Sequence, residues 1–291
     1  MTASTVWLDG TLVDTAAAAP SHLANGLHYG TGVFEGIRSY ATTDGPRIFR
    51  LAEHMARFAK GAAHLGMDVD IDAMAAACAE VLRANDLGDA YIRPLSWFDG
   101  GGLGLDMRVL TARHMVAAMP WSTHLGDDTK ARGVTLRTSS WRRTPSTSVP
   151  ALKLCGNYVN SVIARREALL AGYDEALFVD DRGFVVEGSA ENVFMVRNGR
   201  VTAVQHADAL PGITRDTVRE LTGATSRPVT AAELAEADEI FLVGTSVEVT
   251  GVARLDERDL GVGPVTREVA ALYDAVVRGQ HDAGHAWLAA A

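Results

Sequence analysis

Lysine is scarce in this chain, and one of its lysines stands in a setting that suits covalent chemistry. Of the 27 basic residues only three are lysines, at positions 60, 130 and 153. Lys153 lies in the short apolar segment PALKLCG, directly before a predicted helix. Removal of water from around an amine disfavours the ammonium form and lowers its pKa, which makes the amine a nucleophile toward aldehydes. The alternative is a lysine whose amine extends into solvent, and the local sequence leaves both interpretations open.

Other residues suit the binding of an anion or of a ring nitrogen. Glu187 ends an apolar strand segment; such a carboxylate is usually solvated, but beside a buried pyridine nitrogen it would keep that nitrogen protonated. Gly212-Ile213-Thr214 begins a predicted helix, where free N–H groups favour phosphate, and Gly244-Thr245-Ser246 forms a second turn of small and hydroxyl residues. Arg57, on a helical segment, could bind phosphate through two hydrogen bonds. Ordinary turns and surface arginines explain each feature equally well when it is taken alone.

Further arrangements of reactive residues are weaker. His281 and His285 have the spacing of metal ligands on a helix but lie in a Gly- and Ala-rich tail, so no metal site is predicted. Cys78 and Cys155 are far apart and form no CxxC pair, which predicts neither a disulfide framework nor a zinc site. The P-loop, GxGxxG, GxSxG and HExxH motifs are absent.

Charge and hydropathy narrow the class of protein. The net charge of −9 and the pI near 5.5 argue against a surface for nucleic acid or anionic membrane, since such surfaces need clustered Lys and Arg. No uninterrupted apolar stretch reaches 18 residues, and the N-terminus has no basic segment followed by an apolar core. We therefore expect a cytoplasmic protein that binds neither nucleic acid nor membrane.

The elements that must position these residues alternate between strands and helices. Helical spacing of apolar residues predicts helices over residues 51–66, 71–84 and 158–171, with a last helix from Pro264 to Gly279. Residues 6–13 are predicted to form a hairpin around the turn Asp9-Gly10, and Asn198-Gly199 is a second hairpin turn, within the strand segment 193–204. Further strands are predicted at 91–98, 115–119, 134–139, 175–179, 184–186 and 240–243. The glycines of residues 100–104 predict a mobile loop.

Mixed strands and helices, with several strands joined by hairpins, predict an α+β fold with largely antiparallel sheets. We expect a small N-terminal domain over residues 1–120, a polar linker over 121–132 and a larger domain over 133–291.

Taken together and in this order, the segments resemble the fold-type IV enzymes that depend on pyridoxal 5′-phosphate (PLP), most closely the branched-chain amino-acid aminotransferases. The resemblance extends from residue 7 to residue 278 and implies the two-domain architecture of that fold type. It also implies a homodimer in which one subunit completes the active site of its neighbour. The segments that carry it are residues 27–38, 54–57, 91–94, Lys153 with 156–158, 187–192, 210–216 and 244–245.

The resemblance implies a role for each residue of the site. Lys153 would bind PLP as a Schiff base and then carry the proton between the substrate Cα and the cofactor. Glu187 would pair with the ring nitrogen, Tyr158 with the phenolic oxygen, and Leu210 would lie against the ring. The implied phosphate ligands are Arg57, Ile213, Thr214 and Thr245. The implied substrate contacts are Tyr29, Phe34, Tyr91, Arg93, Trp121, His124, Thr245 and Ser246, with Arg93 as partner of the glutamate side chain.

The implied reaction is a ping-pong transfer of an amino group between a branched-chain L-amino acid and 2-oxoglutarate. Three departures from the family pattern bear on the substrate: His124 stands where a tyrosine is usual, and Leu154-Cys155 and Ser246-Val247 replace small residues. The alternatives are a D-amino-acid aminotransferase, an aminodeoxychorismate lyase, or an aminotransferase of secondary metabolism. A cofactor-free aldolase or decarboxylase would need Lys153 but not Glu187, and a catalytically silent binder is the remaining class.

Overall fold

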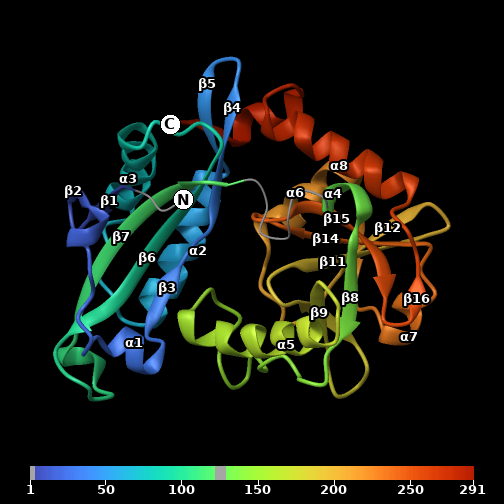
Figure 1. The fold of residues 1–291 in the computed structure, drawn as a ribbon, viewed down its shortest axis with the longest axis horizontal. Coiled ribbons are helices and arrows are strands. Elements are labelled where there is room, and N and C mark those ends of the chain that lie inside the picture. The colour runs from blue at the N-terminus through green and yellow to red at the C-terminus, as the bar shows by residue number, and fades with distance from the viewer. Residues whose placement is uncertain (1–3, 122–128) are drawn as a thin grey trace. The chain divides into compact units, whose positions relative to one another are not determined.

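The computed structural model describes residues 4–121 and 129–291, and the chain divides into two compact units (Figure 1). The first unit comprises the described part of Met1–Ser122 together with Leu152–Asn157 and Val277–Ala291. The second comprises the described part of Thr123–Ala151 together with Tyr158–Val276. None of the helices in the described ranges is long and apolar enough to cross a lipid bilayer.

The first unit is built on an eight-stranded sheet in which every pair of neighbouring strands is antiparallel. Its order is β17-β5-β4-β6-β7-β1-β2, and β3 also pairs with β6. The strands are β1 (Thr5–Leu8), β2 (Thr11–Asp14), β3 (Gly32–Phe34), β4 (Ile37–Thr42), β5 (Gly45–Phe49), β6 (Ala90–Gly100), β7 (Thr111–Pro120) and β17 (Leu288–Ala290).

Two helices supply most of the core that covers this sheet. Met55, Phe58 and Ala62 lie on the buried face of α2 (Leu51–His64), and α3 (Ile71–Ala84) buries its own apolar face in the same core. The i, i+3 and i+4 spacing of these residues is what places them on one side of each helix. A short helix α1 (Asn25–Tyr29) and the 3₁₀ turns η1 (Thr15–Ala17), η2 (Met107–Val109), η3 (Cys155–Asn157) and η4 (Asp282–Trp287) complete the unit.

Two segments expected in the larger domain belong to the first unit instead. Leu152 and Leu154 pack into the core of the first unit, and Val33 and Leu154 form a β-bridge. The C-terminal strand β17 pairs with β5, which extends the sheet at its edge. Tertiary packing therefore assigns Lys153 and the C-terminus to the first unit, through partners more than a hundred residues earlier in the sequence.

The second unit contains a nine-stranded mixed sheet with the order β10-β9-β8-β15-β14-β11-β12-β13, and β16 pairs with β15. Neighbours are antiparallel except for β8 with β9, β8 with β15, and β12 with β13. The strands are β8 (Val134–Thr138), β9 (Glu175–Val179), β10 (Val185–Gly188), β11 (Asn192–Arg197), β12 (Arg200–Val204), β13 (Thr225–Arg227), β14 (Glu239–Gly244), β15 (Glu248–Leu255) and β16 (Arg258–Asp259).

The central strands of this sheet are buried on both faces, as their near-continuous apolar sequences require. Asn198 and Gly199 both have positive φ, as a two-residue turn between β11 and β12 demands. The helices are α4 (Thr129–Arg132), α5 (Tyr158–Leu170), α6 (Ile213–Thr222), α7 (Ala231–Leu234) and α8 (Pro264–Val277). The α+β class with largely antiparallel sheets is confirmed.

Candidate active site

Lys153 lies in the segment of the first unit that bridges to β3. Its carbonyl accepts a hydrogen bond from the Phe34 N–H (3.2 Å), and Nζ lies 4.9 Å from the centre of the Phe34 ring. Burial, and after it the charge of Arg57, lower the pKa of the Lys153 amine from 10.5 to about 8, while the charge of Glu35 opposes the shift. The structure therefore supports the partly desolvated amine rather than the solvent-exposed lysine.

An ion cluster in the first unit holds Arg57. Glu35 accepts two hydrogen bonds from Arg57, from Nε (2.6 Å) and from Nη2 (2.9 Å), and a third from His54 Nδ1 (2.8 Å). These contacts keep the pKa of Glu35 below its usual range although burial alone would raise it. Arg57 therefore stands on α2 with its guanidinium plane fixed by a buried carboxylate.

Four predicted substrate residues of the first unit form one cluster of contacts. The Arg93 guanidinium lies 4.7 Å from the Phe34 ring centre and 5.2 Å from that of Tyr91, and Nη2 donates to Tyr91 Oη (3.0 Å). Arg93 Nε is buried without a hydrogen-bond partner among the described residues. The Trp121 ring packs against Tyr91, with ring centres 4.9 Å apart. The cluster combines an apolar surface with a cation that has hydrogen-bonding capacity in reserve.

The remaining predicted substrate residues are placed differently. Tyr29 is 49% exposed and donates through Oη to the carbonyl of Leu103 in the glycine-containing loop after β6. His124 lies outside the described residues. Thr245 and Ser246 lie half-buried in the turn between β14 and β15, which the Val247 N–H closes by donating to Gly244 O (3.2 Å).

The departures from the family pattern are partly explained by packing. Leu154 points into the core of the first unit, and Val247 is fully buried. Cys155 Sγ lies against Gly32, where an added Cβ would be only 3.0 Å away. Leu154 and Val247 are therefore buried in apolar surroundings, and among the described residues Cys155 and Ser246 are the departures left to bear on the substrate pocket.

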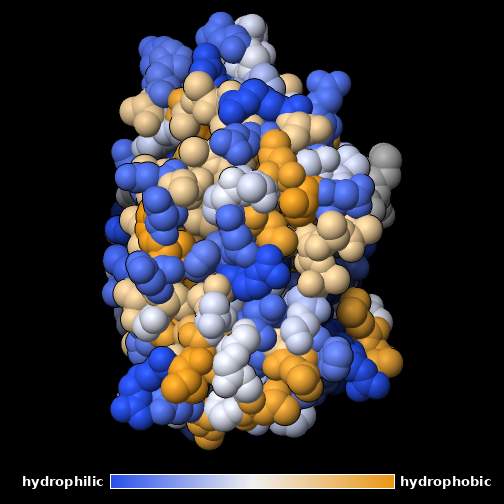
Figure 2. Space-filling model, turned by 90° about the vertical axis from the view of Figure 1, so that its left-hand side faces the viewer, coloured by the Kyte–Doolittle hydropathy of each residue, from blue (hydrophilic) through white to orange (hydrophobic). Residues whose placement is uncertain are grey.

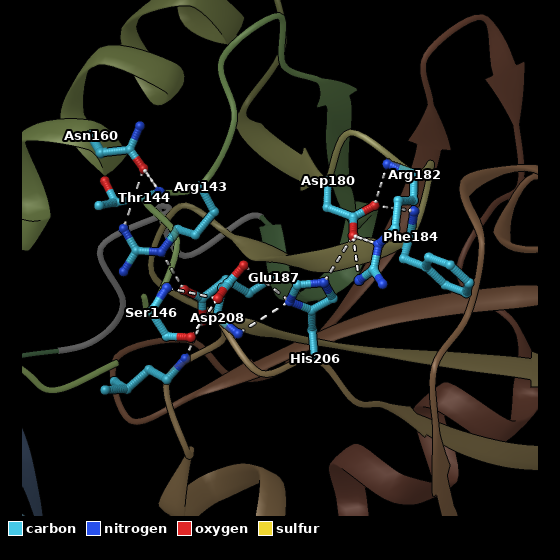
Figure 3. Close-up of polar contacts among 11 residues, drawn as sticks. Arg143, Thr144, Ser146, Asn160, Asp180, Arg182, Phe184, Glu187, His206 and Asp208 are labelled. Atoms are coloured by element: carbon cyan, nitrogen blue, oxygen red, sulfur yellow. Dashed lines mark hydrogen bonds and ion pairs between the residues drawn. The ribbon is translucent and has the colours of Figure 1, made fainter. Parts of the chain in front are cut away.

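In the second unit, Glu187 is the centre of a buried polar junction (Figure 3). It lies on β10 and is 5% exposed. Its Oε1 accepts from Arg143 Nε (2.7 Å), and its Oε2 accepts from the Leu210 N–H (2.9 Å). The carboxylate is thereby oriented by an arginine from one loop and by the backbone of another. Sequence reasoning missed Arg143, because nothing in its local pattern separates it from the other arginines of the chain.

The loop that carries Leu210 is fastened along its length. Asn192 Nδ2 donates to Leu210 O (3.1 Å), and Asp208 Oδ1 accepts from both the N–H and the hydroxyl of Ser146 (each 2.7 Å). His206 Nε2 lies 3.3 Å from Asp180 Oδ2. Figure 3 shows these contacts as a chain that runs from Asp180 through His206 and Asp208 to Ser146. The loop is therefore held in one conformation by side chains from three other segments.

The phosphate-binding candidates follow at the start of α6. Gly212 precedes the helix and has no side chain to cap the first N–H groups. A Cβ at Gly212 would lie 1.9 Å from Asn192 Oδ1, so any larger residue there would displace the Asn192 side chain. Thr214 is buried in the first turn, with Ile213 beside it. Such a helix start suits an anion.

Tyr158, the predicted partner of the phenolic oxygen, is half-buried at the first position of α5.

Known proteins resemble this chain over almost its whole length. Residues 32–255 match the protein family described as "Amino-transferase class IV". The chain is 36% identical to the branched-chain-amino-acid aminotransferase of Pseudomonas aeruginosa, over 97% of this chain and 95% of that protein. A crystal structure of the T.th. branched-chain amino acid aminotransferase with pyridoxamine 5′-phosphate superimposes with a TM-score of 0.94 at 41% identity, covering 99% of this chain and 98% of that one. The same enzyme complexed with N-(5′-phosphopyridoxyl)-L-glutamate gives a TM-score of 0.92 at 40% identity, with 99% and 98% covered.

Proposed function

Because the chain belongs to the class IV aminotransferases, we propose that it is a PLP-dependent enzyme that transfers amino groups between branched-chain L-amino acids and 2-oxoglutarate. The observation that carries the proposal is the amine of Lys153, whose pKa of about 8 makes it a usable nucleophile near neutral pH. The names of the relatives supply the substrate class, and the phosphopyridoxyl-glutamate complex of the T.th. enzyme supports glutamate as the second amino donor.

The described residues fit the chemistry of PLP. Its aldehyde requires an amine of lowered pKa (Lys153), and its ring nitrogen requires a fixed carboxylate (Glu187). Its phosphate requires an oriented arginine (Arg57) and an uncapped helix start (Ile213 and Thr214). When bound, PLP supplies an electron sink that stabilises negative charge at the substrate α-carbon. Tyr158 and Leu210 are proposed to contact the phenolic oxygen and the ring, and Thr245 the phosphate.

Lys153 performs the proton transfers of the proposed reaction. Its amine would hold the aldehyde carbon of bound PLP until a substrate amine displaces it. The released amine is then the base that removes the proton from the substrate Cα and delivers it to the cofactor C4′. A pKa of about 8 suits both steps, since a general base works best when its pKa lies near the operating pH. The second half of the ping-pong reaction runs these steps in reverse on a 2-oxo acid.

The Phe34, Tyr91 and Arg93 cluster is proposed to accept both kinds of side chain. Phe34 and Trp121 offer apolar surface to a branched-chain substrate, and Arg93 offers its guanidinium to the side-chain carboxylate of glutamate. Tyr29, His124 and Ser246 are proposed to complete the substrate pocket.

Substitution of Arg93 separates these two roles. Arg93→Ala should slow the glutamate half-reaction far more than the leucine or isoleucine half-reaction. Arg113→Ala, which breaks a surface ion pair with Asp9, is the matched control. Equal losses in both half-reactions would contradict the role of Arg93.

Half-reaction spectroscopy tests the function as a whole. Purified protein loaded with PLP is mixed with single amino acids, and loss of the visible cofactor band is followed. We expect loss with L-Ile, L-Val, L-Leu and L-Glu and none with D-amino acids. Reaction with D-amino acids only, or pyruvate release from aminodeoxychorismate, would assign the chain to another branch of the fold type. A protein that binds no PLP would be a different class of enzyme altogether.

A homodimer is part of the proposal. Helix α5 exposes Val159, Val162 and Leu170, the last at 73% exposure. The first unit exposes a further apolar group around α1 and the loop after β6: Leu23, Leu27, Leu103, Leu105, Met107 and Val109. Figure 2 shows apolar residues gathered toward the lower end of the face that bears α1. Exposed apolar patches of this kind mark association surfaces. Light scattering should give the mass of a dimer, and a monomer at micromolar concentration would contradict the proposal.

The proposed location is the cytoplasm. It is supported by the two cysteines, Cys78 and Cys155, both of which are free thiols. Fractionation of the source cells checks it, and recovery of the protein with the membranes would contradict it.

A further inference from the structure

Glu35 is a buried carboxylate to which the proposed reaction assigns no step. It follows β3 directly and has no exposed surface. Its two oxygens accept four hydrogen bonds: two from Arg57, one from His54 Nδ1 and one from the Gly36 N–H (3.2 Å). A carboxylate sealed from water in this way costs stability unless every lone pair is engaged. The four hydrogen bonds therefore offset the cost of burying the Glu35 charge.

The donors on Glu35 come from one face of one helix. His54 and Arg57 are three residues apart on α2 and so project in the same direction. The helix approaches β3 closely, because a Cβ added to Gly61 would lie only 2.5 Å from Val33 Cγ2. This close approach is what lets the short Glu35 side chain reach both α2 residues.

The charge states within the cluster are set by its burial. Arg57 and His54 hold the pKa of Glu35 below its usual range, so the carboxylate is ionised at every working pH. Burial lowers the pKa of His54, and Glu35 only partly opposes that effect. His54 is thus neutral at pH 7, and the nitrogen that faces Glu35 carries its proton. The cluster then consists of one anion, one cation and one neutral donor.

We propose that Glu35, supported by His54, is the positioning residue for the phosphate-binding Arg57. This inference rests on the proposed function, since it presumes that Arg57 binds the phosphate of PLP. Two of the five guanidinium N–H groups are committed to Glu35, in the side-on geometry that fixes both the plane and the direction of the fork. An arginine held in this way loses less side-chain freedom when it binds an anion, which strengthens the binding.

The test compares PLP with pyridoxal, which lacks the phosphate. Dissociation constants for both are measured by equilibrium dialysis, and their ratio gives the contribution of the phosphate. Glu35→Gln should lower the preference for PLP over pyridoxal roughly tenfold or more, the size expected when charge-assisted hydrogen bonds lose their alignment. Affinity for pyridoxal itself should change little. A general folding defect would weaken both ligands equally.

Two further variants define the origin of the effect. Arg57→Met should lose the phosphate preference, and adding Glu35→Gln to it should have no further effect, because Glu35 acts through Arg57 alone. Glu53→Gln is the matched control, since Glu53 lies on the same helix, has a 41% exposed side chain and pairs with Arg50. It should leave the ratio unchanged.

The outcomes separate the inference from the function on which it rests. A wild-type protein that does not bind PLP refutes the proposed function. A wild-type protein that prefers PLP, with an unchanged ratio in Glu35→Gln, refutes only the positioning role. If Glu35→Gln does not fold, His54→Leu takes its place: a reduced ratio supports the inference, and an unchanged ratio overturns it.

Discussion

Reaction of the apo-protein with acetic anhydride at increasing pH measures the environment of Lys153 directly. Acetic anhydride modifies neutral amines, so the rate of labelling follows the deprotonated fraction. Burial and the nearby Arg57 lower the pKa of Lys153 from 10.5 to about 8. At pH 7 roughly one amine in ten is then neutral, against roughly one in 3,000 for an unperturbed lysine, a difference of about 300-fold. The labelling rate of Lys153 should therefore rise between pH 7 and 9 and level off above.

The chain is unusually well suited to this measurement. Only Lys60, Lys130 and Lys153 carry side-chain amines, and each gives a separate peptide in mass spectrometry. Lys60 and Lys130 are exposed, so their peptides report delivery of the reagent at each pH. A labelling midpoint for Lys153 at pH 10.5 or above would refute the reasoning, because it would mean that burial and the neighbouring cations do not act on the amine.

Three further outcomes follow from the same contacts. Lys153→Met should stabilise the apo-protein by about 3 kcal/mol below pH 8, where the buried lysine carries an unfavourable charge. The gain should fall to zero as the pH rises from 8 to 10.5, because in that range the lysine of the folded protein is neutral and only that of the unfolded protein is protonated. Urea titrations at several pH values check this. Gly36→Ala places a Cβ 1.9 Å from Tyr91 Oη and should lower kcat/KM for amino donors by roughly 10- to 100-fold, as steady-state kinetics would show. Arg143→Met leaves Glu187 buried without its cation and should cost about 3–5 kcal/mol in urea unfolding, so a loss below about 1 kcal/mol would contradict the pairing.

Local signals in the sequence were sufficient for the elements with strong periodicity. The predicted helices over 51–66 and 71–84 correspond to α2 and α3, and the turn at Asn198-Gly199 joins β11 to β12. In each of these cases the signal lies within one element or one turn. The pairing of strands that no tight turn joins, and the short helix α1, had no such signal, since both depend on contacts between distant segments.

The contents of the site show the same division. Some site residues have a signal in the local sequence. Lys153 and Glu187 are charged residues next to apolar segments, and α6 begins with Gly212-Ile213-Thr214, a sequence that suits an anion. Two ion pairs have no such signal: Glu35 with Arg57, 22 residues apart, and Arg143 with Glu187, 44 residues apart. A contact between segments so far apart leaves no local pattern in the sequence. The assignment of residues 152–157 to the first unit was missed for a related reason: only the core identifies the partner of Leu154.

Chemical trapping of the cofactor tests the central claim most directly. The protein is saturated with PLP, reduced with borohydride, digested and mapped by mass spectrometry. We predict a single phosphopyridoxyl group on the peptide that contains Lys153, and none on the peptides that contain Lys60 or Lys130. Stoichiometric labelling of either of those lysines in place of Lys153, or the absence of any label, would contradict the account.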